Sequence, residues 1–161
     1  MRRAIAYLLL MLATSPALAT ELRVTDPWVR EAPPTAHVMA GYLTLHNDSA
    51  ETRRLVGVSA AGFGMSELHR TVMAEGVARM EHITNLPIEA GATAVLEPGG
   101  HHLMLMHPSQ VPGAGATVAI ELQFDDGSTL QFDAPVQRRR DGGQRHHDHS
   151  GHGSHSGHHG H

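Results

Sequence analysis

The sequence predicts an all-β domain, a Greek-key β-sandwich or barrel, for three reasons. Apolar residues recur with a period of two rather than 3.6 through most of the chain. Short segments with this period are separated by proline, glycine and Asn-Asp punctuation. No stretch of ten or more residues carries a convincing helical pattern. The length of 161 residues predicts one domain.

The expected strands are defined by this alternation and by turn residues. Within residues 41–46, Leu43 and Leu45 face one side, and the intervening side chains face the other. Residues 125–128, with glycine in third place, predict a hairpin turn between two alternating segments. Strands are expected near residues 22–25, 41–46, 54–59, 66–73, 77–83, 93–96, 102–106, 117–124 and 129–136.

The two ends of the chain differ in composition from this domain. Residues 1–19 combine an arginine pair, a short apolar run and Ala-Leu-Ala, which is typical of a cleaved secretory signal peptide. The run is too short to span a bilayer, so no integral membrane segment is expected after cleavage. Residues 138–161 are expected to be a disordered tail, because 141–161 hold eight His, six Gly and three Ser without aliphatic or aromatic side chains. The globular domain is therefore expected over residues 20–137.

Composition excludes several classes of function. The 12 basic residues are all arginine and are outnumbered by 16 acidic ones, which argues against nucleic-acid binding. The absence of cysteine removes disulfides, thiolate metal sites, cysteine nucleophiles and lipid anchoring through a cysteine. No nucleophile elbow, HExxH helix or phosphate loop is present, so the protein is not expected to be an enzyme. The unusual features are 15 histidines and 8 methionines.

Four of these residues form a candidate metal site: His69, Met80, His102 and Met104. His102 and Met104 stand two apart on an expected strand, so both side chains leave the same face. Two imidazoles and two thioethers are borderline-to-soft donors, which suit Cu(I) and bind Zn(II) poorly. A blue-copper electron-transfer centre is excluded because it requires a cysteine. All four donors are neutral, which suits a carrier that must also release its ion.

With these residues in place, the chain resembles a known family, the periplasmic copper chaperones called PCuAC. The family signature is His, ten residues, Met, 21 residues, then His-x-Met, and the four residues match it without a gap. The similarity extends to residues 26–30, 32–34, 41–47, 67–69, 76–80 and 96–105, and the resemblance spans roughly residues 24–136, the whole expected domain. It implies a cupredoxin-like β-sandwich that binds one Cu(I) in the periplasm. It also implies delivery to a copper-accepting partner, the CuA-bearing subunit of a haem–copper (cytochrome c) oxidase or a Sco-type assembly factor.

Other histidines and methionines are weaker candidates. His101 adjoins His102, but the 21-residue spacing and the face shared with Met104 both select His102. Additional metal contacts remain open for a further set, although packing is the favoured interpretation for them: His37, Met39, Met65, Met73 and Met106. The tail histidines are expected to form an auxiliary Cu(II) site: His146, His147, His149, His152, His155, His158, His159 and His161.

Two other classes of function remain open. A periplasmic metal buffer or copper-resistance protein would retain copper rather than transfer it. A plain β-sandwich interaction module, with incidental His and Met, would bind no stoichiometric Cu(I) without its tail. Nothing orients His82 with Glu81, or Ser66 with His69, as a nucleophile and base, so these pairs do not indicate catalysis.

Overall fold

The computed structural model describes residues 21–138, so the expected signal peptide and histidine-rich tail lie outside the described residues. In this part of the chain every regular element is a strand, and the all-β prediction is confirmed. The described segment contains no helix of the length and apolarity required to cross a bilayer. The strands are β1 (Leu22–Arg30), β2 (Val38–Asn47), β3 (Arg53–Ala60), β4 (Phe63–Ala74), β5 (Val77–His82), β6 (Leu86–Ile88), β7 (Thr93–Leu96), β8 (His101–Pro108), β9 (Thr117–Phe124) and β10 (Thr129–Gln137).

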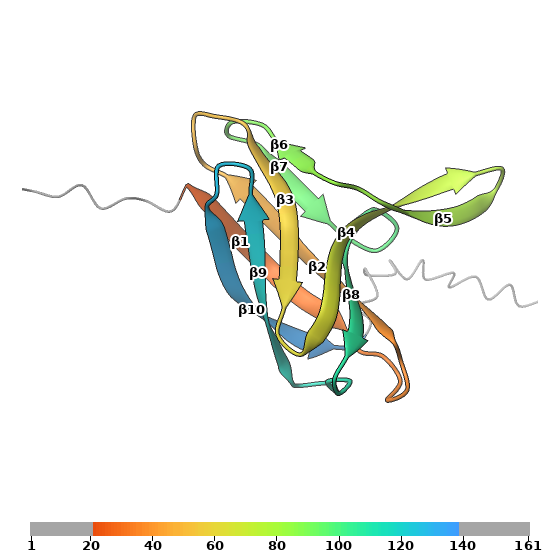
Figure 1. The fold of residues 1–161 in the computed structure, drawn as a ribbon. Coiled ribbons are helices and arrows are strands. Elements are labelled where there is room, and N and C mark those ends of the chain that lie inside the picture. Colours follow the sequence, from red (N-terminus) through yellow and green to blue (C-terminus); the bar gives the residue numbers. More distant parts are fainter. Residues whose placement is uncertain (1–20, 139–161) are drawn as a thin grey trace, which may run out of the picture.

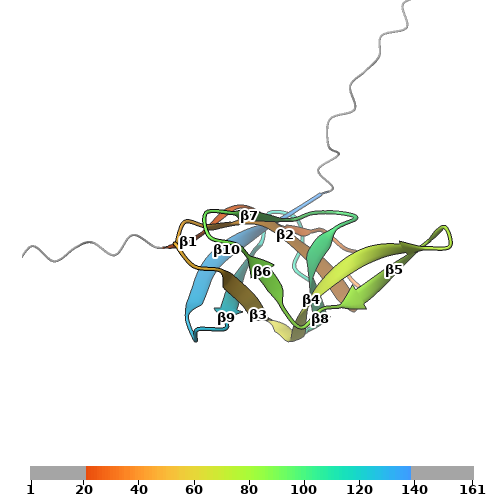
Figure 2. The same cartoon turned by 90° about the horizontal axis from the view of Figure 1, so that it is seen from above.

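The strands form one ten-stranded sheet that folds over on itself, in the order β5-β4-β8-β7-β2-β1-β10-β9-β3-β6. We call β5-β4-β8-β7-β2-β1 the first layer and β10-β9-β3-β6 the second layer. The two layers are joined by a short parallel pairing of β1 with β10, at Val29–Val136 and Arg30–Gln137. Figures 1 and 2 show them facing each other across the domain. Most neighbours in the sheet are not consecutive in sequence, as in Greek-key folds.

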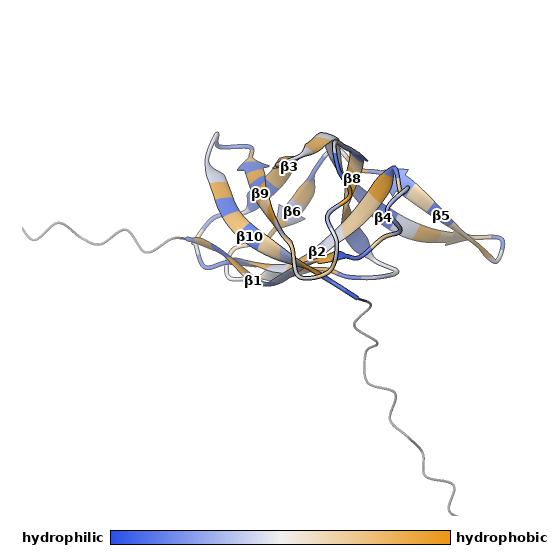
Figure 3. Cartoon of the chain, turned by 90° about the horizontal axis from the view of Figure 1, so that it is seen from below, coloured by the Kyte–Doolittle hydropathy of each residue, from blue (hydrophilic) through white to orange (hydrophobic). Residues whose placement is uncertain are grey.

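The core lies between the two layers and comes from the alternation of apolar residues. Figure 3 shows hydrophobic and hydrophilic residues alternating along β10. In the first layer Leu45, Leu103 and Leu105 are fully buried, and in the second layer Leu122 is fully buried. They belong to a single cluster of buried apolar side chains. Because Leu103 and Leu105 point into this core, His102 and Met104 point to the opposite face of β8.

All the expected strands are present, several of them longer than expected, and one strand was missed. The missed strand is β6, which has only three residues. Its neighbourhood is held by Asn47, a fully buried side chain at the end of β2. The Asn47 amide donates hydrogen bonds to the carbonyls of Glu51, Ile88 and Glu89, at 2.8, 2.9 and 3.1 Å. A contact between residues about forty positions apart leaves no periodic signal in the sequence.

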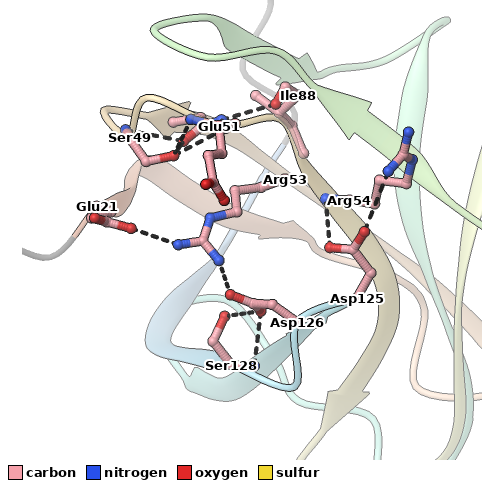
Figure 4. Close-up of polar contacts among 10 residues, drawn as sticks. Glu21, Ser49, Glu51, Arg53, Arg54, Ile88, Asp125, Asp126 and Ser128 are labelled. Carbon is pink, nitrogen blue, oxygen red and sulfur yellow. Dashed lines mark hydrogen bonds and ion pairs between the residues drawn. The ribbon is translucent and has the colours of Figure 1, made fainter.

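The predicted hairpin turn over residues 125–128 is confirmed and is tied to the rest of the sheet by Arg53 (Figure 4). Gly127 adopts φ +82°, a conformation that glycine reaches without strain. Asp126 accepts hydrogen bonds from the amide and hydroxyl of Ser128, at 2.9 and 2.6 Å. The Arg53 guanidinium forms ion pairs with Asp126 and with Glu21, the latter at 2.5 Å. This cluster connects the residue before β1, strand β3 and the β9–β10 turn.

The end of β4 and the whole of β5 extend from the body of the domain as an arm (Figure 1). Every residue of β5 is exposed, and β5 is the terminal strand of the sheet, paired only with β4. Glu75 and Gly76 connect the two strands with φ values of +53° and +78°. Positive φ at both central residues is the mark of the type I′ turn, whose twist matches that of the flanking strands. The arm carries one edge of the candidate site.

Candidate metal centre

The two candidate histidines lie side by side on the outer face of the first layer. His69 on β4 is directly opposite His102 on the antiparallel strand β8. Their ring centres are 6.0 Å apart and their ring planes are inclined by 41°. A third imidazole lies on the other side of His69, because His82 on β5 is opposite it with ring centres 5.6 Å apart.

His102 presents one free nitrogen lone pair in a buried position. Its side chain is only 3% exposed. Its Nδ1 lies 3.1 Å from the carbonyl oxygen of Gly100, so we assign the proton to Nδ1 and the lone pair to Nε2. That Nε2 is buried without a hydrogen-bond partner. Burial lowers the pKa of His102 below its ordinary value, and the nearby His69 and His101 lower it further, whereas the hydrogen bond to Gly100 opposes the shift. The neutral imidazole, which is the form that binds metals, is thereby favoured.

His69 presents its lone pair through the other ring nitrogen. Its Nε2 donates a hydrogen bond of 2.8 Å to a carboxylate oxygen of Glu67. Its Nδ1 is buried and has no partner. The hydrogen bond from Nε2 of His69 is the main cause of the lowered pKa of Glu67. A carboxylate that accepts the second N–H of a histidine fixes the ring orientation and makes the free nitrogen a better metal ligand.

The two candidate methionines approach the histidines from different strands. Met104 is half-buried and is paired with Glu67 on β4 and with Ala40 on β2. Met80 lies on β5 opposite Thr71, and it is 63% exposed. An open cleft of about 350 Å³ brings Met80, His102 and Met104 to one surface. The loop before β8, which contains Pro98 and Gly99, also lines this cleft.

The donor set has a clear chemical consequence. Within residues 21–138, no group of three or more His, Cys, Asp or Glu side chains is arranged to hold one metal ion. The thioethers of Met80 and Met104 are the sulfur donors that line the cleft beside His102. Buried, unpartnered imidazole nitrogens are costly in an apolar setting unless a ligand satisfies them. The residues present fit a soft, monovalent cation better than Zn(II) or a hard ion.

The remaining candidates are placed less favourably. His101 is opposite Arg70, and alternation along β8 directs it away from His102. Met39 is 2% exposed and packs in the core, whereas His37 and Met65 are exposed. Met73 is 70% exposed on the arm, and Met106 is half-buried two residues beyond Met104. The eight tail histidines lie outside the described residues.

Two neighbours of the site were not identified from the sequence. Glu67 stands two residues before His69 on β4, and His82 stands two residues after Met80 on β5. In both cases a spacing of two on a strand places the side chains on one face. That spacing was the available signal, but a lone Glu or His on an exposed strand is usually solvated and carries no role by itself.

The chain matches known proteins in sequence and in structure. Residues 22–136 match the family described as "Putative lipoprotein LpqE-like". The chain belongs to this family. The "Putative lipoprotein Lxx21020" of Leifsonia xyli is 32% identical over 120 residues, which are 74% of this chain and 71% of the relative. The expected resemblance to PCuAC proteins is confirmed at the level of the fold by solved structures.

Two of these structures contain copper according to their names. The solution structure of CuI-DR1885 from Deinococcus radiodurans is 33% identical, covers 77% of this LpqE-like chain and 85% of its own, and has a TM-score of 0.59. The copper-bound PCuAC domain from PmoF2 shares 20% identity, covers 74% and 94% of the two chains, and has a TM-score of 0.63. At that identity the second match supports the fold alone.

Proposed function

We propose that this LpqE-like protein is a copper chaperone that holds one Cu(I) with His69, Met80, His102 and Met104. The observation that supports this most directly is the pair of buried, unpartnered nitrogens, Nδ1 of His69 and Nε2 of His102. They belong to rings 6.0 Å apart, beside the half-buried thioether of Met104. The similarity to a protein solved with Cu(I), at 33% identity, supports the same choice of ion.

Neutral ligands explain why such a site carries an ion rather than using it in catalysis. No thiolate or carboxylate is needed in the set, so the bound ion keeps its single positive charge and is held without strong covalent bonds. The cleft is open and Met80 is 63% exposed, so a partner can approach the site. These features favour a carrier that gives up its ion to another protein, and they give no support to an enzymatic role.

The proposal extends to location and domain organisation. Residues 1–19 direct export and are removed, residues 20–137 form the copper-binding domain, and residues 138–161 form a metal-collecting tail that binds Cu(II). Periplasmic location is supported by the lipoprotein names of the family and of its Leifsonia relative. The 161-residue chain itself has no cysteine to carry a lipid.

The proposed recipient is the CuA-bearing subunit of a haem–copper oxidase or a Sco-type assembly factor, as the PCuAC resemblance implies. The test is to load the protein with one equivalent of Cu(I), mix it with an apo CuA domain or an apo Sco-type protein, separate the two and measure copper in each. Transfer to either recipient supports a chaperone. Retention against both would favour the metal buffer, and failure to bind one Cu(I) would reject the copper site altogether.

A further inference from the structure

Three imidazoles stand in one row across three adjacent strands. His82 on β5, His69 on β4 and His102 on β8 share a register, because His69 is paired with both of the others. We call these three residues the histidine row. The two ring-centre distances are nearly equal, at 5.6 Å to His82 and 6.0 Å to His102. The proposed Cu(I) site uses only two of the three imidazoles.

Both distances suit two imidazoles that bind one ion. A ligating nitrogen lies about 2 Å from the metal, which places the ring centre about 3.2 Å from it and two such centres about 5 to 6.4 Å apart. The His69–His82 and His69–His102 pairs both fall within this interval. By contrast, His82 and His102 are separated by two strand spacings, or about 9.5 Å at the backbone.

His69 can serve only one of its neighbours at a time. Its Nε2 is held by Glu67, so Nδ1 is the single lone pair that it offers to a metal. The part of the chain that the structure describes also shows no group of three His, Cys, Asp or Glu side chains around one ion. The histidine row is therefore two alternative pairs that share His69, and not a three-imidazole site.

We propose that His82, His69 and Met80 form an outer copper position that exchanges its ion with the inner position of His69, Met80, His102 and Met104. This inference rests on the proposed function. When the ion moves outward, His102 and Met104 release it and His82 takes it, while His69 and Met80 remain bound. The step is a ligand exchange on Cu(I), so no electron or proton is transferred.

The inner and outer positions differ in burial, and this difference explains what the exchange achieves. His102 is 3% exposed, so a ligand from another protein cannot easily reach an ion bound to its Nε2. His82 is exposed, Met80 is 63% exposed, and both lie on β5, the terminal strand of the sheet. The inner position thus retains the ion, and the outer position offers it to an acceptor at the edge of the arm.

The experiment compares four variants in the full chain with its eight tail histidines replaced by asparagine, so that only the domain binds copper. The variants are His82→Ala, His102→Ala, the double variant, and His37→Ala as the control for loss of an exposed histidine outside the row. Cu(I) affinity is measured by competition with a chromophoric chelator, and the rate of copper loss by stopped-flow mixing with an excess of that chelator.

We expect His82→Ala to leave affinity nearly unchanged but to slow copper loss at least about tenfold, and the double variant to bind at least about tenfold more weakly than His102→Ala. His37→Ala should change neither quantity. The exchange is rejected if His82→Ala loses copper at the unsubstituted rate and the double variant matches His102→Ala. It is also rejected if His82→Ala weakens binding as much as His102→Ala, because His82 would then be a permanent ligand. Either result leaves the proposed function intact, whereas absence of Cu(I) binding by the unsubstituted domain overturns both.

Discussion

His69 and His102 are opposite each other on adjacent antiparallel strands, and each has one nitrogen held by a hydrogen bond and the other buried without a partner. The hydrogen bonds go to Glu67 and to the carbonyl of Gly100, at 2.8 and 3.1 Å. The protein thus fixes which nitrogen of each ring is available before any ion arrives. Such preorganisation reduces the conformational freedom lost on binding.

The register of β8 leads to the first prediction. Replacing His102 by Ala should weaken Cu(I) binding by more than about 100-fold. This exceeds the loss that is typical when a residue hydrogen-bonded to a metal ligand, rather than the ligand itself, is removed. His101→Ala is the matched control, because His101 is the adjacent imidazole and is opposite Arg70 instead of His69. Competition titration with a Cu(I) chelator measures the Cu(I) affinity of both variants. Equal losses in the two variants would show that the ligand on β8 is misassigned.

The Glu67–His69 hydrogen bond leads to the second prediction. Glu67→Ala should lower Cu(I) affinity by about tenfold or more, because His69 loses the acceptor that orients its ring. Glu67→Gln should lose much less, since the amide oxygen still accepts the Nε2–H bond. The comparison separates orientation from charge. If Gln and Ala cost the same affinity, the negative charge of Glu67 is what matters, and its role as an orienting acceptor is wrong.

The lowered pKa of His102 leads to a prediction for the stability of the metal-free protein. In the unfolded chain this imidazole takes up a proton near pH 6.5, whereas burial keeps it neutral to lower pH in the folded chain. The unfolded state therefore binds more protons below about pH 6.5. The free energy of unfolding should fall as pH drops from there through the lowered folded value, by at most about 1.4 kcal/mol per pH unit for this group.

Urea unfolding between pH 5 and pH 7.5 measures this dependence. His102→Gln should flatten the slope, because glutamine does not titrate and its amide can still donate to the Gly100 carbonyl. Glu67 does not interfere, since its pKa is lowered from an already acidic value and it titrates below this window. An unchanged slope in His102→Gln would mean that another group causes the loss of stability.

The sequence predicted the strands well because their signal is local. Alternation and turn residues are visible within six to ten positions, and they located β8 with its buried Leu103 and Leu105. The three-residue strand β6 was missed because its position depends on the buried amide of Asn47, about forty residues away in sequence. A contact of that kind cannot be read from the period of apolar residues.

In the candidate site, too, features within one strand were predicted from the sequence, whereas features that depend on pairing between strands were not. The spacing of His102 and Met104 on one strand was sufficient to predict a shared face, and the structure agrees. That His69 is opposite both His102 and His82 depends on the register of β4 with β8 and β5. Pairing registers between separate strands are set by the whole sheet, so the histidine row was not predictable from spacing.

Metal choice leads to the fourth prediction. In the chain with its tail histidines replaced, the domain should bind one Cu(I) tightly and Zn(II) poorly, because thioethers are weak ligands for Zn(II). Met104→Leu nearly conserves side-chain volume while removing the sulfur, so it should weaken Cu(I) binding and leave the fold intact. Buried Met39→Leu is the control for the substitution itself. Tight binding of Zn(II) by this domain would reject the copper-specific site.

The last prediction concerns the tail. Its Cu(II) site and the Cu(I) site of the domain should respond differently to a fall in pH. The histidines of residues 141–161 have no sulfur donor beside them, so each Cu(II) ion needs several neutral imidazoles. Their ordinary pKa is about 6.5, and binding should fall steeply once the pH drops below it. The domain uses only two imidazoles, and burial lowers the pKa of one of them, His102, so its Cu(I) should be retained at lower pH.

Titrations of the full chain with Cu(II), and separately with Cu(I), at pH 7.5 and pH 5.5 measure the difference. Replacing the eight tail histidines by asparagine should abolish the acid-labile Cu(II) binding and leave one Cu(I) per chain at both pH values. The asparagine version keeps the length of the chain, so any change reports on imidazoles and not on truncation. Loss of Cu(I) binding in that version would mean that the tail supplies ligands to the domain, and the assignment to His69, Met80, His102 and Met104 would then be incomplete.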